Sequence, residues 1–419
     1  MAGEWTTLPL EDCMAAIIDY RGKSPEKTTS GVPLVTAKIV KGGRIEKPEE
    51  FIAEADFDDW MRRGMPKPGD IVMTTEAPLG EVAQLDGRKV ALAQRVITLR
   101  GKPDVLDNTF LKFLLQSTPV QEELRSRGTG TTVVGIRQSE LRKVSLTLPP
   151  LAEQKAIAAV LGALDDKIEL NRRMNATLEA MARALFQSWF VDFDPVRAKL
   201  DGRVVSSPLP VGEGQGEGFC LDPATAALFP ASFQESALGP IPHGWRAAHL
   251  EEIASVGSGK RPEGRCDVLS PECNIPLYGG GGRMGYVPSA LYDNPILFTG
   301  RVGTLGLIFR TAEPSWPSDN TLIVEPQAGL FDFTYFVLKG FDLVTLNRGS
   351  TQPLLTQTDL KRQKFVLPTK DVVKAFADFS EPIFRQIVSN KRESRTLATL
   401  RDTLLPQLLS GEVQIPNEK

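Results

Sequence analysis

The stretch GTTVVGIRQSELRKVSLTLP at residues 130–149 recurs 219 residues later as GSTQPLLTQTDLKRQKFVLP at residues 349–368. The same offset continues without a gap into the next segment, where Asn171-Arg172-Arg173 matches Asn390-Lys391-Arg392. Self-similarity that keeps one register over so long a stretch is the mark of a duplication. We therefore predict an internal repeat, in which a domain and the segment that follows it occur twice.

Each copy leads into a heptad pattern, with seam residues in steps of four and three over residues 151–199 and 370–412. This spacing is typical of long helices that pack along one stripe. A helix of about 39 residues would be roughly 58 Å long. The seam positions are Ile157, Leu161, Leu164, Ile168, Asn171, Leu178 and Leu185 in the first copy, and Phe376, Ile383, Ile387, Asn390, Leu397 and Leu404 in the second.

Two arrangements fit this seam: each helix could pack on its own domain, or the two helices could pack against each other. Asn171 and Asn390 occupy matching seam positions in the two copies. A buried Asn pair fixes the register of paired helices at some cost in stability. The match therefore favours pairing of the two helices with each other.

The segments before the helices, residues 1–150 and 241–369, contain short apolar runs broken by Gly and Pro. Such runs predict short strands in mixed or β-rich domains. Residues 200–240 carry five acidic side chains against one basic, and include a Gly-Glu run. We expect a flexible linker there with no core of its own, and a short tail at residues 413–419.

The bulk composition is that of a globular protein: 419 residues, 41% hydrophobic, with a net charge of −3. No apolar run approaches the roughly 20 residues that span a bilayer, and residues 1–5 lack the features of a signal peptide. The four cysteines, Cys13, Cys220, Cys266 and Cys273, form no C-x-x-C pair. We therefore expect neither a disulfide framework nor a zinc site, no membrane partner, and a cytoplasmic location.

Candidate catalytic patterns are incomplete. His243 and His249 are the only histidines, and no spacing links them to a nucleophile or a metal cluster. Residues 257–261 resemble a phosphate loop, but Ala254 stands where its first glycine belongs and Arg261 where Ser or Thr is needed. The sequence predicts no catalytic residue, no metal and no cofactor in this chain.

Nucleic-acid binding is better supported, because basic and hydroxyl side chains lie among glycines in the turns and loops. Short glycine turns with hydroxyls can contact phosphates, and arginine suits guanine edges; the alternative is that these are solvated loop charges. The candidates are Arg21, Lys23, Lys38, Arg127, Thr131, Arg137, Lys260, Arg283, Arg301, Arg348 and Thr351.

Four motifs at the helix and domain boundaries carry a family resemblance. They are LPPLAEQ at 148–154, LFQSWFVDF at 185–193, GPIPHGW at 239–245 and LLPQLLSG at 404–411. In combination they resemble the specificity subunits of type I restriction-modification systems. One departure is residues 367–370, LPTK, where the first copy has the fuller motif.

The resemblance implies an α+β protein with two mixed α/β target-recognition domains, each reading one half of a split DNA sequence. Its two long helices would run antiparallel as a coiled-coil spacer with pseudo-twofold symmetry. It also implies no chemistry in this chain: partner methylation subunits carry S-adenosylmethionine and methylate adenine, and restriction subunits join for cleavage. Independently, two similar readers on a fixed spacer should recognise two short sequences about a helical turn apart.

Two other function classes stay open from the residues alone. One is a helical scaffold that does not read DNA, and the other is an enzyme whose site has no recognised motif. Salt-insensitive, weak DNA binding would favour the scaffold. Methylation by the chain without a partner would favour the enzyme.

Overall fold

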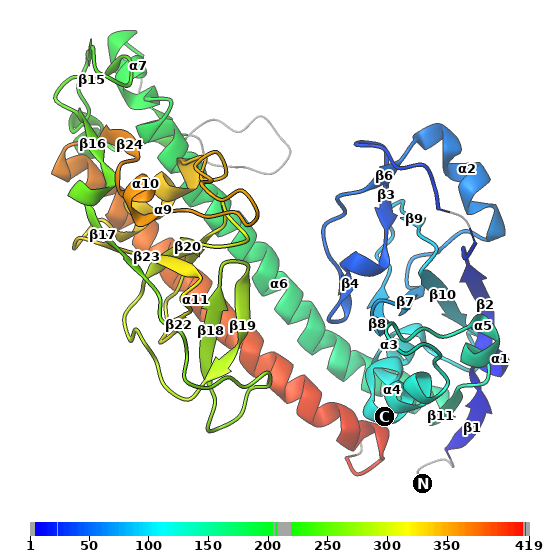
Figure 1. Ribbon diagram of the computed structural model, residues 1–419. Helices are drawn as coiled ribbons and strands as arrows, with labels where there is room; N and C mark the ends of the chain where they lie inside the picture. The colour runs from blue at the N-terminus through cyan, green and yellow to red at the C-terminus, as the bar shows by residue number, and fades with distance from the viewer. Residues whose placement is uncertain (1–4, 23, 204–205, 208–218, 414, 416–419) are drawn as a thin grey trace. The chain divides into compact units, whose positions relative to one another are not determined.

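The computed structural model describes residues 5–22, 24–203, 206–207, 219–413 and 415 (Figure 1). The chain divides into unit 1, residues 1–170 with 393–419, and unit 2, residues 171–392. Each unit contains one β-rich domain and part of each of two long helices, α6 (Leu151–Phe190) and α11 (Lys370–Leu409).

The domain of unit 1 is built on a four-stranded antiparallel sheet in the order β2-β10-β7-β8. All five residues of β7 are buried, as expected for a strand covered on both faces. The sheet consists of β2 (Met14–Asp19), β10 (Val96–Gly101), β7 (Ile71–Thr75) and β8 (Leu79–Gln84). The other strands are β1 (Thr6–Pro9) paired with β11 (Ser145–Leu148), β3 (Val32–Val35) between β6 (Phe51–Ile52) and β9 (Ala91–Leu92), and β4 (Val40–Lys41) paired with β5 (Arg44–Ile45).

Short helices complete this domain, and α3 packs on the sheet. Asp107 begins α3 because its carboxylate accepts a hydrogen bond from the Phe110 amide at 2.9 Å. The helices are α1 (Leu10–Cys13), α2 (Phe57–Trp60), α3 (Asn108–Gln116), α4 (Thr118–Ser126) and α5 (Gln138–Leu141), with 3-10 turns at Ala37–Ile39, Glu54–Asp56 and Met61–Arg63.

The domain of unit 2 repeats this topology, with its main sheet in the order β17-β23-β20-β21. The sheet consists of β17 (Ala254–Ser258), β23 (Thr321–Pro326), β20 (Leu297–Gly300) and β21 (Ile308–Arg310). The other strands are β16 (Arg246–His249) paired with β24 (Lys364–Leu367), β18 (Ile275–Gly279) between β19 (Gly282–Val287) and β22 (Trp316–Pro317), β14 (Phe233–Gln234) paired with β15 (Ile241–Pro242), and β12 (Ser206–Ser207) paired with β13 (Phe219–Cys220). The helices are α7 (Asp194–Leu200), α8 (Pro223–Ala227), α9 (Phe331–Gly340) and α10 (Gln357–Lys361), with a 3-10 turn at Leu250–Glu252.

The two long helices pack together and run antiparallel within each unit. In unit 1, Ile157 and Leu161 of α6 share a core with Leu408 of α11. In unit 2, Phe186 and Phe190 of α6 contact Phe376 of α11 at centroid distances of 5.8 and 5.3 Å. Residue numbers rise along α6 as they fall along α11, so the predicted α+β repeat with an antiparallel helix pair is confirmed.

Polar side chains also join each domain to the helices. In unit 1, Asp165 of α6 pairs with Lys112 of α3 and, at 2.6 Å, with Arg401 of α11. In unit 2, Asp332 of α9 accepts hydrogen bonds from Arg310 and Ser380, at 2.7 and 2.8 Å. Because these groups are largely buried, loss of Asp165 would leave Lys112 without its carboxylate and would leave Arg401 with only the more exposed Asp402.

The first long helix ends earlier than the sequence indicated. We expected it to reach residue 199, but α6 ends at Phe190 and the chain turns at Phe193, whose φ is +55°. Pro195 then lies in the first turn of the separate helix α7, a position that suits its fixed φ. The second helix likewise ends at Leu409 rather than residue 412, with Gly411 in the left-handed region.

The expected linker at residues 200–240 is partly folded. Phe229 is 2% exposed and belongs to the core of unit 2, next to α8. The expectation of a coreless segment is therefore wrong for this part. The Gly-Glu run itself lies outside the described residues.

The expectation on cysteines is also corrected. Cys266 and Cys273 form a disulfide in unit 2, between residues whose Cα atoms are 6.3 Å apart. Sequence spacing alone could not show it, because the two thiols meet only when the intervening residues form a turn. Cys13 is buried and free.

We predict that Asp165→Asn lowers the free energy of unfolding by about 3 kcal/mol, because Lys112 and Arg401 lose their shared counter-charge. The measurement is urea unfolding of the full chain. The adjacent exposed residue supplies the control: Asp166→Asn should change stability by less than about 0.5 kcal/mol. Equal effects of the two substitutions would contradict this account of the helix attachment.

Candidate nucleic-acid interface

Each unit carries a tight, exposed turn at the repeated sequence. In unit 1, the amides of Thr129 and Gly135 each donate to the other residue's carbonyl, at 2.8 and 2.9 Å. Gly130 has a φ of +116°, and a Cβ on it would lie 2.1 Å from the Val133 carbonyl oxygen. Only glycine fits there. Thr131, a sequence candidate, is exposed within this turn.

The turn in unit 2 is built in the same way. The Arg348 amide donates to the Leu354 carbonyl at 2.8 Å, and a Cβ on Gly349 would lie 1.8 Å from the Gln352 carbonyl oxygen. Thr351, the second candidate hydroxyl, is exposed within it. At the repeat offset, Thr351 matches Thr132, the residue after Thr131, so the two turns present hydroxyl side chains from the same part of the repeat.

Both turns attach to the end of a matching strand of the main sheet. The Ile136 amide donates to the Thr75 carbonyl at 2.9 Å, at the end of β7. The Leu355 amide donates to the Arg301 carbonyl at 2.9 Å, just after β20. The fold thus holds each turn against a rigid element, which sets the position of its exposed side chains.

An arginine beside each turn is engaged within its own unit. Arg127 pairs with Glu123 at 2.9 Å and lies 3.7 Å from Glu140. Arg348 makes two hydrogen bonds to Asp359, at 3.0 and 2.7 Å. Each arginine therefore has an acidic partner within its own unit, and its direct contact with DNA stays a prediction.

The ion pair in unit 2 lowers the pKa of its acidic partner, Asp359. Hydrogen bonds from Arg348 and then Thr356 lower the pKa of Asp359 below its usual value. The contribution of this pair to the stability of the turn is therefore present above the usual Asp pKa. It is lost as the pH falls through the lowered value.

The remaining sequence candidates lie in several places. In unit 1, the Arg21 guanidinium donates to the Ile136 carbonyl at 2.8 Å and so lies beside the turn, and Arg137 is exposed next to it. Lys38 pairs with Glu49 at 3.3 Å, on another part of the domain. Lys23 lies outside the described residues.

In unit 2, Arg301 is half-buried beside the turn. Lys260 and Arg283 are exposed on other elements, and Arg283 lies over the Tyr286 ring at 5.2 Å. The structure thus brings Arg21, Thr131 and Arg137 together in one unit. It brings Arg301, Arg348 and Thr351 together in the other.

The helix-seam candidates divide between the units. Asn171 and Asn390 are both buried, and the Asn390 amide donates to the Asn175 side chain at 2.9 Å. The buried seam residues are Ile157, Leu161, Asn171, Leu185, Phe376, Ile383, Ile387 and Asn390. The half-buried ones are Leu164, Ile168, Leu178, Leu397 and Leu404.

The features that resembled catalytic sites have structural roles. The His249 ring lies 2.9 Å from the Arg362 carbonyl oxygen, where it joins β16 to the end of α10. Residues 254–258 form strand β17, so the loop and helix that would cradle a phosphate do not occur there. Within the described ranges, no group of acidic, His or Cys side chains could hold a metal, and no helix is long and apolar enough to cross a membrane.

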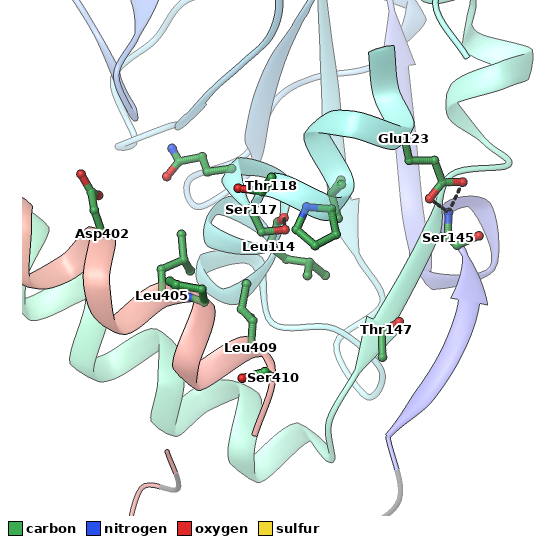
Figure 2. A pocket seen from close by; sticks show the side chains of 14 residues that line it. Leu114, Ser117, Thr118, Glu123, Ser145, Thr147, Asp402, Leu405, Leu409 and Ser410 are labelled. Atoms are coloured by element: carbon green, nitrogen blue, oxygen red, sulfur yellow. Dashed lines mark hydrogen bonds between the residues drawn. The ribbon is translucent and has the colours of Figure 1, made fainter. Parts of the chain in front are cut away.

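A groove of about 760 Å³ lies in unit 1 between the corner of α3 and α4, strand β11 and the end of α11 (Figure 2). Leu114, Val120, Leu405 and Leu409 line it. At the repeat offset, Leu409 matches Phe190 of unit 2, which is buried beside Trp245. The helix end is therefore open in unit 1 and covered in unit 2, a difference that the sequence repeat does not reveal.

The duplicated domains, each with a matching turn on a matching strand, define a protein with two similar binding modules. The model of the type I restriction modification DNA specificity domain matches residues 26–180 and 242–398. The chain belongs to this family.

Individual relatives agree with the family match. The chain is 24% identical to the type I restriction enzyme MjaIX specificity subunit of Methanocaldococcus jannaschii, over 92% of this chain and 87% of that protein. It is 26% identical to the HindI specificity subunit of Haemophilus influenzae, over 77% of this chain and 81% of that protein. The fold is similar to the crystal structure of a type I S subunit from M. genitalium, with a TM-score of 0.55 at 18% identity, over 99% of this chain and 97% of that one.

We predict that Asp359→Asn speeds hydrogen exchange of the amides in residues 348–355, because Arg348 loses its partner. Amides of residues 129–135 in the other unit are the internal control and should not change. Hydrogen–deuterium exchange with mass spectrometry measures both. In the wild type the same amides should exchange faster, relative to the intrinsic rates of an unstructured peptide of the same sequence, as the pH falls through the lowered pKa of Asp359. Unchanged exchange at 348–355 would show that the ion pair does not hold the turn.

Proposed function

We propose that this chain is the DNA-specificity subunit of a type I restriction-modification complex, in which each domain reads one half of a split double-stranded target. The observation that carries the proposal is that the family model matches each half of the chain separately, on two domains of the same topology. Two similar modules joined by one helix pair suit two short sequences separated by an unread gap. The alternative of a scaffold that does not read DNA gains no support from this membership.

Within each domain, we assign positioning and reading to different residues. The hydroxyl-rich turns contact phosphates, because exposed hydroxyls and backbone amides suit that role and carry little sequence information. Arg21 and Arg137 in unit 1 and Arg301 in unit 2 lie beside the turns, where they can approach the DNA. Arg127 and Arg348 hold the turns in place.

The chain itself catalyses nothing in this proposal and holds no cofactor. Methylation subunits bind it and methylate adenine with S-adenosylmethionine, and restriction subunits join for cleavage. The open groove at the end of α11 and its covered counterpart support unequal docking at the two helix ends. A complex that acts on host DNA belongs in the cytoplasm, so the Cys266–Cys273 disulfide would have to persist in a compartment where such bonds are uncommon.

We predict that replacing residues 241–369 with the corresponding domain of a relative of different specificity changes one half of the methylated sequence and leaves the other half intact. The reason is that the exchanged segment contains the whole main sheet and turn of unit 2 but none of unit 1. Methylation sequencing of cells that express the chimaera with its methylation subunit measures the outcome.

The matched control exchanges residues 1–150 instead and should change only the other half. A change of both halves by either exchange would show that the domains do not read independently. Salt dependence tests the scaffold alternative in the same complexes, since phosphate contacts make DNA affinity fall steeply with salt.

A further inference from the structure

The loop of unit 2 between β17 and β18, residues 259–274, ends in an exposed apolar tip. Val268 and Leu269 are 77% and 58% exposed, and they lie inside the ring closed by the Cys266–Cys273 disulfide. Among the described residues, no other large apolar side chain is as exposed as Val268. Apolar surface in water is unfavourable, so such a tip points to a partner that covers it.

The base of this loop is fixed. Cys266 and Tyr286 exchange two backbone hydrogen bonds at 2.9 and 2.8 Å, which join the loop to β19. Ser270 and Cys273 exchange two more, at 3.2 and 3.1 Å. A Cβ on Gly285 of β19 would lie 2.6 Å from the Cys266 carbonyl oxygen, so the loop lies directly on that strand. The tip is therefore presented on a rigid base.

The charges of the loop indicate which part of DNA it meets. Lys260, Arg261 and Arg265 are balanced by Glu263, Asp267 and Glu272. A loop with no net charge gains little binding free energy from the phosphate backbone, because the backbone attracts net positive charge. Its distinctive group is the apolar tip, and apolar side chains read DNA mainly through the methyl group of thymine in the major groove.

The repeat itself singles out this loop. Its counterpart in unit 1 lies between β2 and β3 at residues 20–31, which contain no cysteine. The turns at 129–135 and 348–354, by contrast, are alike in the two units. Two modules that read different half-sites must share the parts that position them and differ where they read bases. The loop with the disulfide belongs to the differing part.

We propose that the Val268–Leu269 tip reads one half-site by apolar contact with a thymine methyl group, and that the Cys266–Cys273 disulfide holds the tip in shape. This inference rests on the proposed function and names the base-reading element within it.

The test uses the full chain in complex with its methylation subunits and a DNA library in which both half-sites vary. In V268S/L269S, preference for thymine at one position of one half-site should fall roughly tenfold, and the other half-site should be read as before. The matched control is V344S, which changes an apolar side chain of the same unit that is 61% exposed, and it should leave both half-sites unchanged. C266S/C273S should lower the preference for thymine at the same position of the half-site, by a smaller factor than V268S/L269S.

Unchanged thymine preference in V268S/L269S, with a split target still methylated, would overturn the tip proposal and leave the proposed function standing. The proposal would also be overturned if V268S/L269S loses its methylation subunits on purification while the fraction that keeps them discriminates DNA as the wild type does. The tip would then bind a protein partner. A wild-type complex that methylates no split target would overturn the proposed function itself.

Discussion

The packing of α6 against α11 is the interaction on which the rest of the structure depends. In unit 1 the helix residues Ile157 and Leu161 lie in the same apolar cluster as Phe110 and Phe113 of the domain. In unit 2, Phe376 packs against Phe336 of α9 at a centroid distance of 6.0 Å. The core of each domain is thus continuous with the helix pair. A domain cannot turn on its helices without breaking its own core, so within each unit the reading surface has a fixed relation to the spacer.

The polar residues in the helix pair add specificity to this packing. Asn171 and Asn390 are buried where a leucine would pack more favourably, and the Asn390 side chain donates to Asn175. Only one register of the two helices satisfies that hydrogen bond, so a shift along the pair would leave a buried amide unpaired. The buried amides thus exchange some stability for a single defined register of the helix pair within unit 2.

The sequence predicted the features that depend on local spacing and on self-similarity. The repeat at offset 219 and the heptad steps through Ile157 and Phe376 were sufficient to predict two domains and two long helices. What depends on contacts between distant residues could not be predicted. The pairing of Arg348 with Asp359 needs the turn to close, and the burial of Phe229 needs the aromatic cluster around Trp245. The early end of α6 depends on the left-handed conformation of Phe193, which no local pattern indicates.

The measurement that tests the central claim most directly is single-molecule methylation sequencing of host DNA with the gene for this chain intact and then deleted. We expect a split motif with one N6-methyladenine on each strand to be present in the first genome and absent from the second, because two fixed readers direct one methylating complex. A motif that persists after the deletion, or a lost motif that is continuous, would contradict the account of two modules on one spacer.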